Sequence, residues 1–472
     1  MVMQVMPNVM ISGDGTPQPD EDDRPLVSFS VDQRSAYLAQ LLALGQSLPP
    51  SVDPLPESVA RLQGQAAARI PELAIPSSRH EDWRFTNLAP LLQLQFQATA
   101  NICSFTLGQL AALLIPEAQY RLVFVDGVFA PSLSLLARLP EGVTLGNLAT
   151  ADPQQLEQYL GQQPGAEEVF TTLNTATFKD VAWVHLAPGV TLDAPLHLLW
   201  ISTLDRQGPI VSQPRALIVA DRDSSLHLVE DFVTLGEGCT NGLAGGTYLT
   251  NGVTEVVLGD RALVHHSRLQ RDGTGAFHVG KTSVSQGTES RYSQVAIHLG
   301  GHLSRHNLDV VHRGQQTETQ LFGLALVNQT QLMDTHSNLL YQHPHCSSQQ
   351  LYKAIVGDRG RSVFNGRIHV PQAAQMTNAQ QLNRNLLLSS QARVDTKPQL
   401  EIVADNVKCT HGATVSQLED DQIFYLQSRG LDRISAHHLL LDGFAGEILQ
   451  KLPVESLRHS LARCVACRMM DV

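Results

Sequence analysis

The feature that most limits the possible folds of this chain is a long series of short, β-branched runs. From about Tyr120 to about Ile402, segments rich in Val, Ile, Leu and Thr recur at intervals of roughly a dozen residues, punctuated by Gly, Asn and Asp. No convincing helical pattern separates them. Folds that alternate helix and strand are therefore disfavoured, which leaves a sandwich, a propeller or a β-solenoid.

Two properties of these runs favour a solenoid whose successive turns lie in parallel. Asn-Gly hairpin turns are few, and Gln, Asn and Ser appear inside the runs, as stacked polar side chains would. No Trp-Asp or blade-like signature repeats along the chain. The repeat has no fixed length, so the pattern predicts the class of fold and not the number of turns.

Helical patterns lie on both sides of the β region. The short runs and the helical patterns divide the chain into four regions. These are a disordered N-terminal extension (1–31), an N-terminal helical region (32–119), a β-helix core (120–415) and a C-terminal helical domain (416–472). The extension contains an acidic, Pro-rich stretch that is typical of a solvated tail. Helices are expected over 57–69, 416–430 and 435–452, with a third C-terminal helix after Pro453.

Charge and composition argue against several classes of partner and location. The chain has 33 Lys and Arg against 45 Asp and Glu, a net charge of −12, and no basic run, so neither nucleic acid nor an anionic membrane surface is expected as the main partner. No apolar run approaches the ~20 residues that span a bilayer. The start of the chain resembles neither a signal nor a transit peptide. Six cysteines in so long a chain predict free thiols in a reducing compartment, and we expect a cytoplasmic protein.

One stretch matches a nucleotide-binding pattern. Gly275–Thr282 reads GAFHVGKT and fits GxxxxGKT, a motif that works where a helix begins at the lysine and directs its amides at phosphate. The residues that follow, 283–292, are rich in Ser and Thr and lack a helical period, which favours a strand. A P-loop-type nucleotide hydrolase using Gly280, Lys281 and Thr282 is the alternative function.

Several histidine and cysteine pairs are candidate metal sites. His343–Cys346 reads HPHC, but one short segment does not close a tetrahedral site, so surface or core histidines are favoured. His265 and His266 would point to opposite faces of a strand. Cys464 and Cys467 form a CxxC without the strand that precedes a redox motif, which favours two thiols on a helical tail.

The most informative stretch is Lys408–Thr414, which reads KCTHGAT. If it is extended, Cys409 and His411 project from the same face, as joint ligation of a soft metal requires. Lys408 could favour the thiolate, and a Cys-His nucleophilic pair is a competing chemistry. A buried Cys at a strand end, with a capping His, is the structural alternative.

Here the chain resembles a known family. The segment Ala404–Gly430, ADNVKCTHGATVSQLEDDQIFYLQSRG, resembles the C-terminal signature of SufD, a scaffold component of the SUF iron-sulfur cluster assembly system. Asn406 and Ser416 depart from it, since Asp and Gly would be expected there. Four further stretches agree with the family: SRHEDWRFTNLAPLL (78–92), LNTATFKD (173–180), VFNGRIHVPQAAQMTNAQQLNRNLLLS (363–389) and TKPQLEI (396–402).

This resemblance implies a right-handed parallel β-helix flanked by helical regions. It also implies a non-catalytic scaffold that pairs through its β-helix with the related SufB, as a heterodimer, and docks the ATPase SufC through its C-terminal helices. A homodimer is possible when the chain is isolated. No nucleotide would then be bound by this chain itself, because SufC supplies the ATPase.

The implied site follows from the same resemblance. His411 would contribute to a transient iron-sulfur cluster or iron at the SufB/SufD interface, with Cys409 beside it as the weaker candidate. On the C-terminal helices, the residues expected to contact the partner are Phe424, Tyr425, Arg429 and Phe444. A β-helix polysaccharide enzyme would instead need carboxylates that converge on one face, and the sequence places no such set together.

Overall fold

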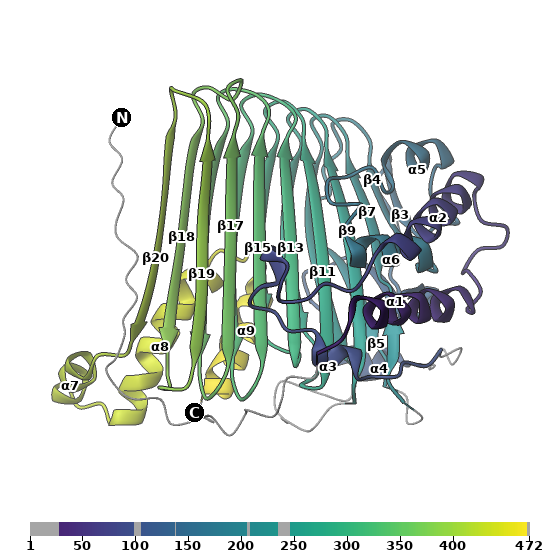
Figure 1. Cartoon of the computed structure of the whole chain (residues 1–472). Helices are drawn as coiled ribbons and strands as arrows, with labels where there is room; N and C mark the ends of the chain where they lie inside the picture. Colours follow the sequence, from purple (N-terminus) through teal and green to yellow (C-terminus); the bar gives the residue numbers. More distant parts are fainter. Residues whose placement is uncertain (1–27, 99–104, 137, 205–207, 235–245, 470–472) are drawn as a thin grey trace.

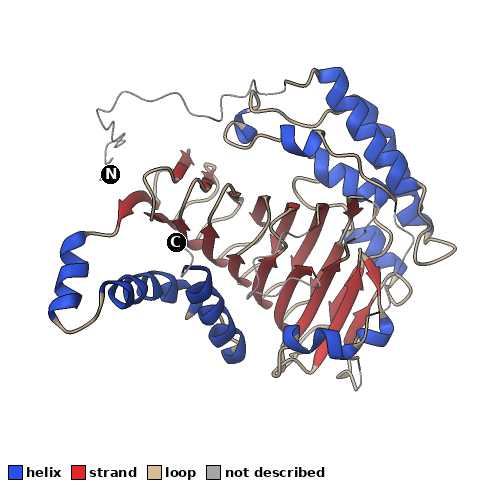
Figure 2. Cartoon of the chain, turned by 90° about the horizontal axis from the view of Figure 1, so that it is seen from below, coloured by secondary structure: helices blue, strands red, loops and turns tan. Residues whose placement is uncertain are grey.

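Two parallel sheets form the body of the molecule, and helices cover the outer face of each (Figures 1 and 2). The structure is a computed structural model, and it describes residues 28–98, 105–136, 138–204, 208–234 and 246–469. The predicted fold class, mainly β with a parallel β-helix between helical regions, is confirmed. Among the described residues, no helix is both long and apolar enough to cross a bilayer.

The strands alternate between the two sheets along most of the chain. Sheet B runs, in spatial order, through β2 (Val128–Phe129), β1 (Tyr120–Val125), β5 (Leu196–Ser202), β8 (Ser225–Thr234), β10 (Leu263–Arg271), β12 (Arg291–His298), β14 (Glu318–Val327), β16 (Ser347–Val356), β18 (Asn378–Leu387) and β20 (Lys408–Gln417). Sheet A runs through β3 (Val143–Gly146), β4 (Ala182–Leu186), β7 (Arg215–Ala220), β9 (Tyr248–Leu258), β11 (Ala276–Gln286), β13 (Leu303–His312), β15 (Leu332–Tyr341), β17 (Arg361–Val370) and β19 (Arg393–Ile402), with β6 (Ile210–Ser212) pairing β9.

The pairing is parallel except at the start of the solenoid. There β2 pairs antiparallel with β1, and β3 with β4, so short antiparallel strands close this end. Because side chains alternate between the two faces of a strand, every second residue points between the sheets. The main core cluster fills that space with aliphatic and aromatic side chains.

One of the loops that connect the two sheets recurs in successive turns of the solenoid, each time with a residue in the left-handed backbone conformation. Six non-glycine residues with positive φ each donate their amide N–H to a carbonyl of the next turn of the solenoid: Asp223, Arg261, Glu289, Gln316, His345 and Met376. The backbone hydrogen bonds of the turn therefore stack as those of the strands do. This ladder fixes the register of successive turns at the corner as well as in the sheets.

The N-terminal helices cover the early part of sheet A. They are α1 (Val31–Gln46), α2 (Glu57–Arg69), α3 (Ala89–Leu92), α5 (Pro153–Tyr159) and α6 (Val169–Thr177). The short helix α4 (Leu107–Leu110) instead packs on the outer face of sheet B, where Leu110 clusters with Val123 of β1 and Leu199 of β5. Leu38 and Leu41 of α1 pack with Phe277 and Val279, which point outward from sheet A. The expected helix over 57–69 is observed as α2, and the Ser30 side chain caps α1 by accepting from the Gln33 amide.

Three helices follow β20: α7 (Asp420–Ser428), α8 (Arg433–Leu449) and α9 (Glu455–Met469). Helices α8 and α9 pack on the outer face of sheet B through a second apolar cluster, whereas α7 extends away from the sheets (Figures 1 and 2). The expected helix over 416–430 begins later than predicted. Ser416 and Gln417 complete β20, because they remain paired with β18.

Candidate functional site

The two ends of the solenoid differ, and the C-terminal end is open. Strands β19 and β20 are the last strands of their sheets, and among the described residues no strand pairs with their outer edges. An unpaired strand edge is a template for association with another chain. Exposed apolar side chains surround this end: Met376, Ile402, Val403 and Val415.

The inward-facing side chains of these two strands form what we call the mouth of the solenoid. Its members are Cys409, His411, Ala413 and Val415 of β20 together with Thr396, Pro398 and Leu400 of β19. In earlier turns of the solenoid, side chains at these positions are covered by the next turn. Among the described residues, no further turn covers the side chains of β19 and β20. Pro398 has no amide N–H to offer at the edge, which is a usual feature of edge strands.

Cys409 and His411 lie on one face of β20, as the extended reading of KCTHGAT predicts. Cys409 is opposite Ala379 of β18, and His411 is opposite Gln381. Cys409 is half-buried against the core cluster, whereas His411 is exposed. The structure thus places an imidazole and a thiol side by side at the open end, with the imidazole the more accessible of the two.

The environment of Cys409 favours its neutral form. Burial raises the pKa of the Cys409 thiol above its ordinary value, and a backbone hydrogen bond with Ala379 offsets only part of this effect. Proximity to Lys408 in sequence does not produce a lowered pKa. Since the thiolate is the nucleophile and the metal ligand, Cys409 needs a metal or a partner charge to lose its proton.

Sequence reasoning overlooked the layer of side chains beneath the mouth. In β18 three successive inward residues are amides, Gln381, Asn383 and Asn385, and each is buried. The signal was available, because Leu382 and Leu386 alternate with these amides on the other face. The amide layer could be recognised only with the knowledge that the leucine face of β18 packs against helices and that its amide face points into the solenoid.

Comparison with known proteins gives the family. A model described as SUF system FeS cluster assembly, SufBD core domain, matches residues 202–444, and one for the SufBD protein N-terminal region matches 55–198. The chain belongs to the SufBD family. An iron-sulfur cluster assembly SufBD family protein of Synechocystis is 44% identical over 87% of this chain and 91% of its own length.

Two further relatives of this SufBD protein carry informative names. The chloroplastic protein ABCI7 of Arabidopsis thaliana is 34% identical over 89% of this chain and 88% of its own length. The iron-sulfur cluster assembly protein SufD of Escherichia coli is 31% identical over 84% of this chain and 89% of its own length. The SUF-system resemblance read from the motifs is confirmed, and the chain is a component of iron-sulfur cluster assembly.

The P-loop alternative is wrong for this SufBD protein. All of Gly275–Thr282 except its first residue lies within the buried strand β11, and no helix begins at Lys281. The Lys281 ammonium pairs with Asp309 and lies 2.9 Å from the Glu168 carboxylate. Burial lowers the pKa of this lysine, but the two carboxylates outweigh burial and leave the pKa raised. The lysine is a structural ion-pair partner on the outer face of sheet A.

The other histidine pairs also have structural roles. His266 points inward and contacts Glu230 and Tyr292, whereas His265 points outward, as predicted. His345 occupies a corner of the turn ladder, and the buried Cys346 thiol donates to the carbonyl of His343. In the part of the chain that the structure describes, no three His, Cys, Asp or Glu side chains come together as a metal site.

The predicted partner-binding residues fall into two groups. Phe424 and Tyr425 on α7 are 72% and 57% exposed, and the guanidinium of Arg429 lies 5.3 Å from the Tyr425 ring. Phe444 on α8 instead faces the body of the molecule, where its ring centre is 4.3 Å from Lys353 Nζ. The geometry therefore offers α7 as a free surface and makes Phe444 part of the contact between α8 and sheet B.

The C-terminal CxxC differs from its prediction at one position. Cys467 is free and exposed, whereas Cys464, on the buried side of α9, is disulfide-bonded. The expectation of free thiols is therefore wrong for Cys464 and confirmed for Cys346, Cys409 and Cys467. Cys103 and Cys239 lie outside the described residues.

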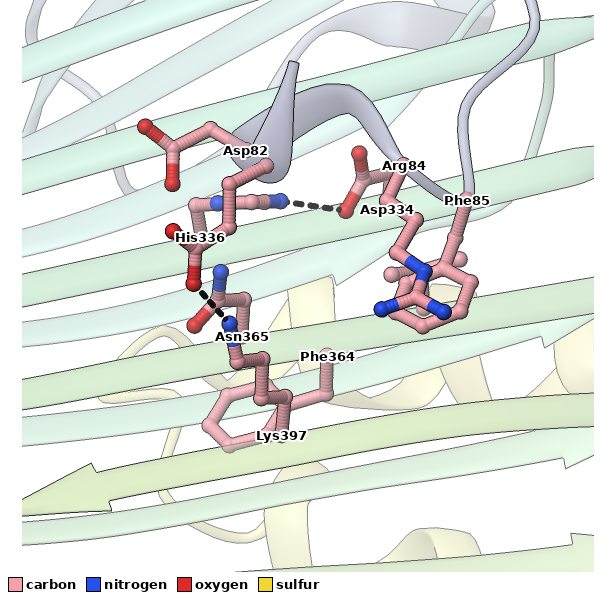
Figure 3. A pocket seen from close by; sticks show the side chains of 10 residues that line it. Asp82, Arg84, Phe85, Asp334, His336, Phe364, Asn365 and Lys397 are labelled. Atoms are coloured by element: carbon pink, nitrogen blue, oxygen red, sulfur yellow. Dashed lines mark hydrogen bonds and ion pairs between the residues drawn. The ribbon is translucent and has the colours of Figure 1, made fainter. Parts of the chain in front are cut away.

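A groove with a volume of about 460 Å³ lies on the outer face of sheet A. A smaller hollow continues from it under Asp82 and Phe85, where His336 lies 2.9 Å from Asp334 (Figure 3). Arg305 pairs with Asp334 at 2.6 Å, as Lys281 does with Asp309 and Glu168. Because the cations are already paired, the groove favours no charged class of ligand.

Proposed function

We propose that this chain is a non-catalytic scaffold subunit that pairs with a SufB-type protein and docks a SufC-type ATPase. At the interface of the pair, His411, with Cys409 beside it, contributes to holding an iron-sulfur cluster while it is built. The observation that carries this proposal is the position of His411: an exposed imidazole in the inward row of the last strand, at the open end of the solenoid.

The open end supports pairing with another β-helix. A second solenoid that abuts here would satisfy the unpaired backbone groups of β19 and β20 and cover Val403 and Val415, which are 59% and 42% exposed. At the other end of the solenoid, the short antiparallel strands β2 and β3 leave fewer backbone groups unpaired. Pairing is therefore expected at the C-terminal end, where His411 lies.

The C-terminal helices support docking of a further subunit. Helix α7 and the start of α8 expose Phe424, Tyr425, Ile434 and Leu439, which is unusual for side chains of this size. Lys353 of sheet B anchors α8 by donating to the Phe444 carbonyl at 2.9 Å and by pairing with Glu447. A movement imposed on α7 by an ATPase can thus reach the sheet through α8.

The chemistry of the mouth suits a transient cargo. Imidazole nitrogen and thiolate sulfur are suitable ligands for iron, but two ligands do not complete a tetrahedral site. The remaining ligands come, in this proposal, from the partner. A site shared between two subunits can be opened by moving them apart, so a cluster built there can be released. The chain itself binds no nucleotide, and its location is the cytoplasm.

The test is reconstitution of the complex with SufB and SufC from one organism, comparing wild type with His411→Ala. Both should form the complex, and the variant should lose most of the cluster yield, measured anaerobically by absorption and Mössbauer spectroscopy. His343→Ala, which removes an exposed histidine from a turn, is the matched control. Unchanged cluster yield in His411→Ala would overturn the ligand assignment, and failure of the wild-type chain to form the complex would overturn the function.

A further inference from the structure

The amide layer beneath the mouth contains one side chain whose polar atoms are not used. Gln381, Asn383 and Asn385 lie opposite His411, Ala413 and Val415 respectively, and all three amides are at most 2% exposed. Buried amides are normally hydrogen-bonded, so each atom without a partner in such a layer needs an explanation.

The two asparagines of the layer are largely accounted for. Asn385 donates to the Asn383 side-chain oxygen at 2.6 Å and to the Thr414 carbonyl at 3.2 Å, and Asn383 donates to the Tyr352 carbonyl at 3.2 Å. Gln381 differs from both. Neither its Nε2 nor its Oε1 has a hydrogen-bond partner among the described residues, although both atoms are buried.

The position of Gln381 is nevertheless tightly defined. A Cβ added to Gly366 of β17 would lie 1.7 Å from Gln381 Nε2, so the side chain occupies the space that the absent side chain of Gly366 leaves. The amide therefore extends across the interior from sheet B to sheet A. It is placed without a hydrogen bond, one turn behind the open end.

The side chain that lies next to Gln381 on the open side is His411. Adjacent strands are about 4.8 Å apart, and directly opposed residues of parallel strands point the same way. The two side chains are thus neighbours in one inward column, with Gln350 next to Gln381 on the deeper side. Gln350 differs from Gln381, because its Oε1 accepts from the Ser337 hydroxyl at 2.9 Å and only its Nε2 lacks a partner among the described residues.

We propose that Gln381 is a positioning residue for His411. In the structure the His411 ring is exposed, and the Gln381 amide oxygen has no partner among the described residues. When the ring turns toward the amide, this oxygen accepts a hydrogen bond from one imidazole N–H. That bond fixes the tautomer and the ring orientation and directs the other nitrogen out of the mouth toward the metal. Ligand histidines generally depend on such a partner at their second nitrogen. This inference rests on the proposed function for its biological meaning, but the hydrogen bond needs no residue of another chain.

The first test is made on the isolated full chain, labelled with ¹⁵N at histidine. The His411 signals are identified by their loss in His411→Asn, and the ¹⁵N shifts of the two ring nitrogens report the tautomer. In wild type we expect one tautomer, and in Gln381→Met a mixture. Gln381→Glu, which keeps an acceptor, should restore one tautomer, and Gln350→Met, one turn deeper in the same column, should leave His411 unchanged. Identical His411 shifts in wild type and Gln381→Met would overturn the proposal.

The second test uses the complex with SufB and SufC and Fe(II) as the probe. Gln381→Met should weaken iron binding about tenfold, which is the usual loss when the partner of a ligand histidine is removed. Gln381→Glu should bind iron within a few-fold of wild type, whereas loss of affinity in Gln350→Met equal to that in Gln381→Met would overturn the assignment. If His411→Ala leaves cluster yield unchanged, the proposed function fails, but the ¹⁵N shifts still decide whether Gln381 positions the ring.

Discussion

Two polar regions inside the same solenoid are built in opposite ways. In the closed interior, Glu230 of β8 accepts hydrogen bonds from Thr254 at 2.6 Å, from His266 at 3.1 Å and from Trp200 at 3.2 Å. At the mouth, Gln381 is also buried but has no hydrogen-bond partner in the described part of the chain, and His411 beside it is exposed. Both regions break the rule of an apolar core, yet Glu230 is hydrogen-bonded within the chain and Gln381 is not.

The charges of the closed interior show how such a region is stabilised. Burial alone raises the pKa of Glu230, but the hydrogen bond from His266 and the charge of Arg268 outweigh it, so that this pKa lies below its ordinary value. Arg268 in turn contacts His278 at 2.8 Å and lies 4.8 Å from the Phe232 ring. A buried charge that is paired costs far less free energy than one left without its partner, whereas an unpartnered amide next to an exposed ligand indicates a site awaiting its partner.

The largest effect on stability is expected from breaking the closed interior. Arg268→Met removes one member of a buried charge cluster and leaves Glu230 without its cation, which typically costs about 3–5 kcal/mol. Denaturant unfolding of the full chain, monitored by circular dichroism, should show the midpoint shifted accordingly.

The control for this prediction is Arg291→Met on the surface of the same sheet. Arg291 is 69% exposed and lies 3.6 Å from Glu318, so its loss should cost less than about 1 kcal/mol. Equal losses in the two variants would mean that the buried cluster does not stabilise the fold as its contacts indicate.

The sequence predicted the fold more completely than it predicted these two regions. The β-branched runs, few hairpin turns and internal polar residues led to a parallel solenoid, and residues 57–69 to α2. Glu230 and Arg268 could not be recognised as buried, because alternation alone does not say which face of a strand is inside. That choice depends on α8 and α9 covering the other face of sheet B, which is a long-range property.

The pH dependence of stability should also originate in the closed interior. His312 points inward, is stacked on Tyr341 with ring centres 4.2 Å apart, and has its pKa lowered to about 3 by burial. In the unfolded chain a histidine has a pKa near 6.5. Between these values the unfolded state binds a proton that the native state does not, so the free energy of unfolding should fall as pH is lowered from about 6.5 to about 3.

Substitution of His312 tests this expectation. His312→Phe keeps a ring against Tyr341 and removes the titrating group, so the acid loss of stability should be shallower by up to about 1.4 kcal/mol per pH unit in that window. Tyr341→Phe, which leaves the imidazole in place, should keep the wild-type slope. Parallel pH profiles for wild type and His312→Phe would show that His312 is not a source of the acid sensitivity.

The candidate site was predictable only in part, and for a physical reason. Cys409 and His411 are two residues apart in a strand, so their common face follows from local geometry. Gln381 lies 30 positions earlier than His411 and is brought beside it by one turn of the solenoid, whose length varies along the chain. No local pattern encodes that register, and the missing partners of Gln381 become visible only after the turns are stacked.

The smallest effect on stability, with a clear effect on association, is expected at the mouth. Val415 is 42% exposed in the inward row of β20, so Val415→Asp should change the free energy of unfolding by less than about 1 kcal/mol. A charge placed there would be buried by a second solenoid, and affinity for the SufB-type partner, measured by sedimentation or surface plasmon resonance, should fall at least about tenfold. Leu135→Asp is the matched control, because Leu135 is 41% exposed and lies beside β1, at the other end of the solenoid. Equal loss of affinity in both variants, or no loss in Val415→Asp, would place the interface with the SufB-type partner away from the mouth.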